Sequence, residues 1–201
     1  MDPKFNGIVW TGTNLLDVTA PDIEAIHAID IARGLTRKFR FGGHTRSDLP
    51  PYSVAWHSLF CEMVADQMGL PVWVRIQALL HDAPEYVLCD MITPVKRLLP
   101  DYAALEEQLW FAIAQKYGVP MAMHPAVHEI DNIALNVERL HLVAPHSWDP
   151  APHVPDEWVT VGAKWIEFCQ ARAPQADTLA AALFHSRLTA LLDALAQEVV
   201  E

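Results

Sequence analysis

The sequence predicts an all-α protein, and two observations favour this fold class. Apolar residues recur at helical spacing in successive segments of the chain. Strand signals are weak, because no alternating run of β-branched residues is flanked by hairpin turns. The composition, 52% hydrophobic and 19% charged, is that of an ordinary globular protein. We therefore expect a single domain over residues 1–201, built as a bundle of about six or seven helices.

Capping residues and glycines set the bounds of the expected helices. Asp22 and Ser53 can each cap a helix start, and Gly69 and Gly118 follow helix ends. Residues 1–21 show no helical period and are expected to form an extended or irregular arm. Residues 145–155 are expected to form a proline-rich loop, and residues 156–201 to form the C-terminal helices. The expected helices cover residues 22–37, 53–68, 72–86, 102–117, 126–144, 156–172 and 177–200.

The charge of the chain restricts its partners. The formal net charge of −11 would repel a phosphate backbone, which argues against a partner that is a nucleic-acid polymer. A small anionic substrate remains compatible with this charge if a metal ion or a local basic cluster holds it.

Cysteine use and hydropathy favour a cytoplasmic protein. Cys61, Cys89 and Cys169 are odd in number and form no CxxC pattern, so neither a disulfide framework nor a thiolate zinc site is indicated. No stretch approaches the roughly 18 uninterrupted apolar residues that span a bilayer, and no targeting signal is recognised. We therefore expect no membrane partner and a reducing compartment.

Residues 79–90 concentrate groups that bind metals or handle protons. An apolar run ends in His81, Asp82, Glu85 and Asp90. Neighbours on a helix lie about 100° apart, so His81 and Asp82 can lean toward one point only at the buried edge of the helix. The stretch is therefore interpreted as part of a metal site on a core helix.

Two more residues extend this site. His57 lies among apolar neighbours, and a lone histidine there is more often a hydrogen-bonded core residue than a ligand. Asp131 stands inside the apolar stripe of the helix expected at residues 126–144. A buried carboxylate is costly without a metal ion or a basic partner. Only a metal ion also accounts for His57, His81 and Asp82.

These residues resemble the pattern of the HD-domain metal-dependent phosphohydrolases. The resemblance is closest to the branch that contains bacterial 5'-deoxynucleotidases and small phage deoxyadenosine triphosphate triphosphohydrolases. It covers roughly residues 22–140. Its most specific part is the order of His81-Asp82-Ala83-Pro84-Glu85, then Asp90, then Thr93-Pro94-Val95-Lys96, which is similar to the signature HD-A-x-E-x4-D-x2-TPVK.

The resemblance implies a role for each matching residue. His57, His81, Asp82 and Asp131 would bind a divalent ion, with Co, Mn, Zn, Fe and Ni all suited to such ligands. Glu85 would orient or deprotonate the attacking water. Asp90 would act near the substrate, or else cap the following loop. The substrate-side residues would be Arg40, Phe41, Thr93 and Lys96.

Two positions depart from the family pattern. An Arg-Trp pair that favours deoxyribose in the family corresponds here to Arg40-Phe41, in a loop of different length. In this interpretation Phe41 would still supply an apolar wall, and Arg40 would clamp phosphate. The alternative is that the segment is only a solvated loop between helices, without a binding role. Trp56 replaces an acid before the first ligand, and is interpreted as filling core volume.

Three functions are compatible with this pattern. The first is a 5'-deoxynucleotidase, which converts deoxyribonucleoside 5'-monophosphates to deoxynucleoside and phosphate. The second is a triphosphohydrolase that releases triphosphate from a deoxynucleoside triphosphate. The third is a nucleotide-binding sensor with a vestigial site. Relatives of the resembled family assemble as dimers or larger rings, so a homo-oligomer is expected. The apolar stripe of the last helix, formed by Leu179, Leu183, Leu188, Leu191 and Leu195, fits an interface or the core equally well.

Overall fold

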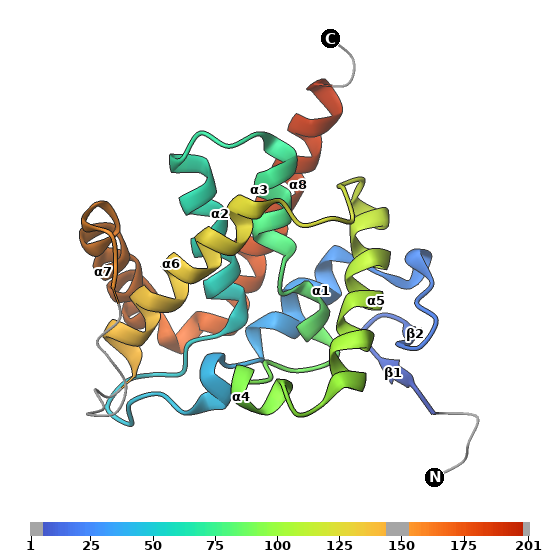
Figure 1. The fold of residues 1–201 in the computed structure, drawn as a ribbon, viewed down its shortest axis with the longest axis horizontal. Coiled ribbons are helices and arrows are strands. Elements are labelled where there is room, and N and C mark those ends of the chain that lie inside the picture. The colour runs from blue at the N-terminus through green and yellow to red at the C-terminus, as the bar shows by residue number, and fades with distance from the viewer. Residues whose placement is uncertain (1–5, 144–152, 199–201) are drawn as a thin grey trace.

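The computed structural model describes residues 6–143 and 153–198 (Figure 1), and it confirms the all-α fold class. Eight α-helices and one two-stranded sheet lie within these residues. The elements are β1 (Ile8–Trp10), β2 (Leu15–Asp17), α1 (Ala28–Thr36), α2 (Val54–Gln67), α3 (Val72–Leu80), α4 (Thr93–Lys96), α5 (Pro100–Tyr117), α6 (Pro125–Leu142), α7 (Asp156–Ala171) and α8 (Ala176–Glu198). The described residues also form short 3-10 turns, which are η2 (Ile23–Ala25), η3 (Arg40–Gly43), η4 (Ala83–Tyr86) and η5 (Ala173–Gln175).

Helix α2 is the centre of the bundle. It packs against α1, α3, α6 and α8, and it is buried on nearly all sides. Trp56 is 1% exposed and meets the rings of Trp165 and Phe168 edge-on, at centroid distances of 5.8 and 5.9 Å. Trp56 therefore fills core volume, as its replacement of a charged residue suggested.

Residues 1–21 were expected to form an extended or irregular arm, and part of that segment is extended but pairs as a hairpin that was not predicted. Strands β1 and β2 pair antiparallel, with Val9 opposite Leu16. Thr11 Oγ1 donates to Oδ2 of the buried Asp30 at 2.8 Å, and Thr13 donates to the same oxygen. Strands of three residues are too short to show alternation, and the hairpin is held largely by contacts to Asp30 in α1.

The helix expected at residues 22–37 begins later than predicted. Asp22 does act as a cap, but it accepts from Glu24 N in the short turn η2. Ile26 then takes an extended conformation, with φ −91° and ψ 113°, and α1 starts at Ala28. Asp22 therefore caps a helical turn, as predicted, but the long helix expected to begin there does not form.

The helix expected at residues 72–86 is broken at the functional stretch. Helix α3 ends at Leu80, and Asp82 has φ −95° and ψ 10° before the separate turn η4. Pro84 explains the break, because it lacks an N–H donor and disfavours helical conformation in the residue before it. The break frees His81 and Asp82 from the 100° separation that a continuous helix would impose.

Turn η4 lies directly against α1. A Cβ atom added to Gly34 would lie 2.9 Å from the carbonyl oxygen of Tyr86 and 2.8 Å from its Cβ. No larger residue fits between the two backbones without movement, so Gly34 fixes how closely α1 approaches the turn that carries Glu85.

The remaining helices lie close to the predicted bounds. Helix α5 ends at Gly118, which has φ 67° as a left-handed cap. Helix α4 was not expected, because residues 91–100 were interpreted as a loop, and it accounts for the eighth helix. The proline-rich loop expected at residues 145–155 falls largely outside the described residues.

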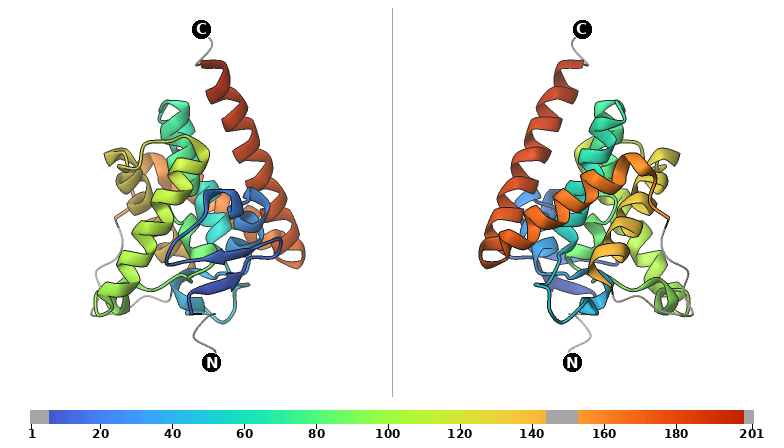
Figure 2. Two further views of the ribbon diagram at one scale, coloured as in Figure 1. Left: turned by 90° about the vertical axis from the view of Figure 1, so that its right-hand side faces the viewer. Right: turned by 90° about the vertical axis from the view of Figure 1, so that its left-hand side faces the viewer.

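Helix α8 lies along the side of the bundle. It packs against α1, α2 and α3, and its last turns extend beyond the other helices (Figures 1 and 2). Leu188 and Leu191 are buried, whereas Leu183 is 37% exposed, so most of the apolar stripe belongs to the core. Residues 173–198 are long and apolar enough to cross a membrane by length and composition alone, with 28% of the tested window buried.

Candidate metal centre

The four predicted metal ligands meet at one point between α2, α6 and the end of α3. The Nε2 atom of His57 lies 3.2 Å from His81 Nε2 and 3.2 Å from Asp131 Oδ1. Asp82 Oδ2 lies 3.4 Å from each of the two histidine Nε2 atoms. Atoms bound to one ion at 2.0–2.2 Å are about 3.3 Å apart in a tetrahedral arrangement, so these separations fit a shared ion.

The hydrogen bonds on the far side of each ring fix the imidazole tautomers. His81 Nδ1 lies 2.9 Å from the carbonyl oxygen of Ala78, which can only accept, so Nδ1 carries the proton. His57 Nδ1 donates to Glu138 Oε1 at 2.7 Å. In the neutral rings, both Nε2 lone pairs therefore face each other and two carboxylates. Such a group of acceptors without a proton between them requires a cation.

The charges around this point favour a positive occupant. Burial alone would lower the pKa of His81, yet Asp82 and Asp131 raise it. Burial would raise the pKa of Asp131, but its contacts with His57 and His81 lower it. The centre therefore attracts either protons or a metal ion, and the two compete for the same atoms.

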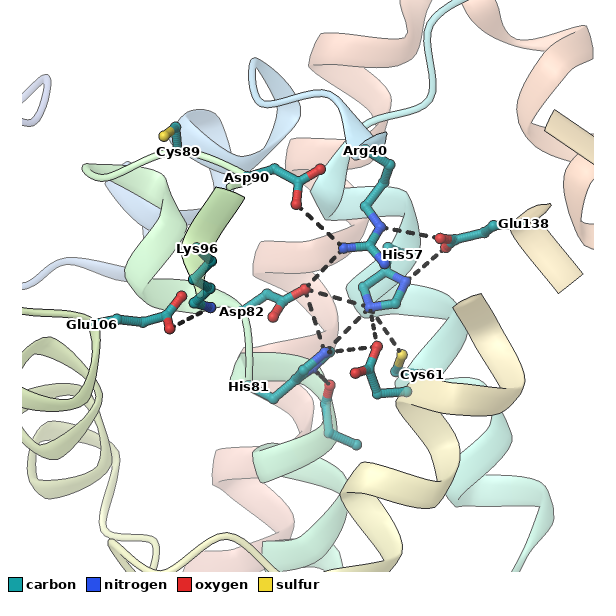
Figure 3. A network of polar contacts seen from close by, with 12 residues as sticks. Arg40, His57, Cys61, His81, Asp82, Cys89, Asp90, Lys96, Glu106 and Glu138 are labelled. Atoms are coloured by element: carbon teal, nitrogen blue, oxygen red, sulfur yellow. Dashed lines mark hydrogen bonds and ion pairs between the residues drawn. The ribbon is translucent and has the colours of Figure 1, made fainter. Parts of the chain in front are cut away.

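Glu138 is a central residue that sequence reasoning missed. It is fully buried in α6, and its Oε2 accepts from Arg40 Nε at 3.1 Å while Oε1 holds His57 (Figure 3). A carboxylate behind a ligating histidine fixes the orientation of the ring and increases its basicity. Glu138 follows Asp131 by two helical turns on the same apolar face, and that spacing was the available signal.

Arg40 occupies a different position from the open phosphate clamp that was expected. Its side chain is 10% exposed and lies between three carboxylates (Figure 3). Besides Glu138, its Nη1 atom lies 3.5 Å from Asp82 Oδ2 and 3.6 Å from Asp90 Oδ1. Arg40 therefore joins the metal centre to Asp90, and its charge is already shared among acids.

Glu85 lies in turn η4, close behind the ligands. It is 4% exposed, and its Oε2 has no hydrogen-bond partner among the described residues. Burial, and then the charges of Asp82 and Asp90, raise the pKa of Glu85 well above its usual value. A carboxyl group in this state is suited to accepting and returning a proton.

One cavity is lined by three of the proposed ligands and another by Arg40 and Asp90, and the predicted substrate residues are divided between the two. The first, here called the metal-side cavity, has a volume of about 320 Å³ and is lined by His81, Asp82, Asp131 and Lys96 among others. The second, here called the Arg40 cavity, has a volume of about 540 Å³ and is lined by Arg40, Phe41, Asp90 and Thr93 among others. Lys96 is therefore separated from the other predicted substrate residues.

The metal-side cavity is acidic. Glu106 and Glu107 line it together with the carboxylate ligands, and Lys96 forms an ion pair with Glu106. In the Arg40 cavity, apolar side chains such as Ile92 and Leu135 predominate. The two cavities thus offer different surroundings to a charged and an apolar part of a substrate.

Cys61 is a second residue near the centre that sequence reasoning did not assign. Its Sγ lies 3.6 Å from His57 Nε2, and the ligand atoms of His57, Cys61 and His81 all lie within 4.8 Å of one another. Burial raises the pKa of this thiol to about 11. Cysteine spacing did not identify Cys61 as a possible ligand, because a search for CxxC considers cysteines alone. Cys61 follows His57 by four residues on the same helix, which places the two side chains on one face.

Comparison with known proteins identifies similar chains of undescribed activity. A protein of Rhodobacter capsulatus is 40% identical over 132 residues, which are 62% of this chain and 65% of that protein. The Escherichia coli protein YfdR is 40% identical over 113 residues, which are 56% of this chain and 59% of YfdR. The chain thus matches less than two thirds of the length of each relative, and both are described as uncharacterised. No family model matches the chain.

Proposed function

We propose that this protein is a metal-dependent phosphohydrolase of nucleotides, and specifically a 5'-deoxynucleotidase that releases phosphate from deoxyribonucleoside 5'-monophosphates. The observation that carries the proposal is the convergence of two imidazole lone pairs and two carboxylates beside a cavity. The resemblance to HD-domain phosphohydrolases supplies the reaction class and the deoxynucleotide.

The donor set supports a divalent transition-metal ion. His57, His81, Asp82 and Asp131 would hold it, since imidazole and carboxylate together suit Co, Mn, Zn, Fe or Ni. Such an ion supplies positive charge for phosphoryl oxygens and acidifies water. Glu138 would keep the ring of His57 in the orientation that binding requires.

The residues around the ion would divide the remaining work. Glu85 would take the proton of the attacking water, because its unpartnered oxygen lies in a buried turn next to the ligands. Asp90 would act at the leaving-group side, where it lines the Arg40 cavity. Arg40 would fix the positions of Asp82 and Asp90 and add positive charge near the phosphate. Phe41 would provide an apolar wall for the nucleoside.

The charge of the cavities favours a monophosphate over a triphosphate. A triphosphate needs several free cations, but Lys96 is paired with Glu106 and Arg46 is paired with Asp48 at 2.6 Å. Glu107 would also repel additional phosphates in the metal-side cavity. Triphosphohydrolase activity is therefore the less favoured candidate.

Product analysis tests the proposal. The protein, stripped of metal and reloaded with each divalent ion, is incubated with dAMP, AMP and dATP, and products are separated by chromatography. We expect deoxyadenosine and phosphate from dAMP, and no triphosphate from dATP. Release of triphosphate would establish the alternative activity. Nucleotide binding without any product, at every metal, would reject both activities in favour of a sensor.

Assembly and location belong to the same proposal. A homo-oligomer is proposed from the resemblance, and light scattering of the purified protein measures it directly. A cytoplasmic location is proposed from cysteine use, and cell fractionation tests it. Helix α8 is the element to follow in both experiments, because its end extends beyond the bundle (Figure 2).

A further inference from the structure

Cys61 is placed as a metal ligand would be. It lies one helical turn after His57, so both side chains project from the same face of α2. Cys61 is fully buried, and its Sγ approaches the same His57 Nε2 atom that faces the other ligands. The thiol is therefore part of the group of converging donor atoms and does not lie in a separate apolar pocket.

The separations agree with a sulfur ligand on the same ion. An imidazole nitrogen at about 2.05 Å and a thiolate at about 2.3 Å from one tetrahedral ion are about 3.6 Å apart. The distance from Cys61 Sγ to His57 Nε2 is 3.6 Å. Two imidazole nitrogens on such an ion are about 3.3 Å apart, and the structure has 3.2 Å between His57 and His81.

We propose that Cys61 binds the metal ion of this centre as a thiolate and makes the centre select thiophilic ions, such as Zn²⁺ and Co²⁺, over Mn²⁺ and Mg²⁺. This inference rests on the metal centre of the proposed function. On binding, the S–H bond breaks, a sulfur–metal bond forms, and the proton leaves to solvent. Soft sulfur donors favour these ions, whereas carboxylates alone suit Mn²⁺ and Mg²⁺.

The ligand set allows this role. His57, His81 and Cys61 with one carboxylate make four ligands, the number that zinc prefers. The Asp131 side chain is 38% exposed and His57 is fully buried, so Asp131 is the ligand most open to exchange with solvent or phosphate. The thiolate would hold the ion in place while Asp131 yields its position.

Cobalt spectroscopy tests the inference independently of activity. The metal-free protein is titrated with Co²⁺ while the near-ultraviolet region is recorded for a thiolate-to-cobalt charge-transfer band. The variants are Cys61→Ser and, as matched control, Cys169→Ser, which changes another buried cysteine that does not belong to the group of possible ligand atoms formed by His57, Cys61 and His81. We expect the band in the wild type and the control, and its loss in Cys61→Ser. The ratio of Zn²⁺ to Mn²⁺ affinity should fall by about tenfold or more in Cys61→Ser.

The outcomes separate this inference from the proposed function. Visible cobalt absorption without a charge-transfer band in the wild type would overturn the role of Cys61 and leave the metal centre intact. Failure of the wild type to bind Co²⁺, Zn²⁺ or Mn²⁺ would instead reject the centre itself. The wild-type spectrum decides even if the Cys61→Ser variant fails to fold.

Discussion

Two groups of charged residues beside α2 differ in how their carboxylates are neutralised. On one side, Glu62 and Asp66 are paired with Arg75 and Arg187, at distances of 2.6–3.3 Å, and the formal charges cancel. We call this group the balanced cluster. At the metal centre, the guanidinium of Arg40 contacts three carboxylates and a fourth contacts His57, so one positive charge accompanies four negative ones and the formal charge is −3 with neutral histidines. Those carboxylates are Asp82, Asp90, Asp131 and Glu138.

The difference indicates which cluster binds something from outside. Ion pairs in the balanced cluster satisfy every carboxylate with a protein cation, so they join α2, α3 and α8 without further help. The metal centre has too few cations and its histidines direct lone pairs inward. Burial alone therefore does not identify a carboxylate as a metal ligand. A carboxylate group with too few protein cations and protons around it is a better indication.

Removing a ligand should have the largest effect. Asp82→Ala is expected to lose the bound metal and to lower kcat/KM by roughly a thousandfold or more, because several kcal/mol of charge stabilisation depend on the ion. Metal analysis and phosphate release measure the two effects. Asp66→Ala in the balanced cluster is the control and should keep its metal. Equal metal content in wild type and Asp82→Ala would contradict the centre.

Replacing the proton-handling acid should have the next largest effect. Glu85→Gln is expected to lower kcat by about a hundredfold to ten thousandfold, since the amide cannot accept the proton of water. Metal content should stay at the wild-type level, because Glu85 is not a ligand. Wild-type kcat in this variant would remove Glu85 from the mechanism.

Weakening the support of His57 should have a smaller effect. Glu138→Gln keeps the size of the side chain but removes the negative charge that holds the Nδ1 proton. We expect metal affinity to fall about tenfold to a hundredfold, with activity recovered at saturating metal. Competition with a chelator measures the affinity. An unchanged affinity would show that the charge of Glu138 acts only on Arg40.

The balanced cluster should affect stability alone. Glu62→Gln leaves Arg75 and Arg187 without a full counter-charge and is expected to lower the free energy of unfolding by about 1–3 kcal/mol. Denaturant titration measures the loss, and metal content should not change. Loss of metal in this variant would mean that the two clusters are coupled through α2.

The sequence was sufficient where a local pattern determines the structure. Periodic apolar residues predicted α2, α5 and α6, and the placement of His57, His81, Asp82 and Asp131 predicted a group that the structure brings together. The helices are confirmed because the spacing of apolar residues is a property of one short segment. The role of the four side chains as metal ligands stays a prediction.

Other features depended on contacts between distant segments. The hairpin at residues 8–17 is held by Asp30, and Arg40 is drawn inward by Glu138, which lies on another helix. Neither contact has a local signature. The break after Leu80 did have one in Pro84, but the apolar period of α3 outweighed it in the prediction. The division of Lys96 and Thr93 between two cavities likewise arises only in the folded chain.

The contact between Gly34 and Tyr86 has a consequence for how the proposed site tolerates substitution. The backbone of η4 rests on α1 with no side chain between them, so the position of Glu85 depends on a residue that touches no ligand. A methyl group at position 34 would push the turn, and with it Glu85 and the adjoining Asp82, without changing any of the proposed site residues. If the proposed activity holds, a substitution at position 34 would alter it through helix packing, an effect that a comparison of the proposed site residues alone would overlook.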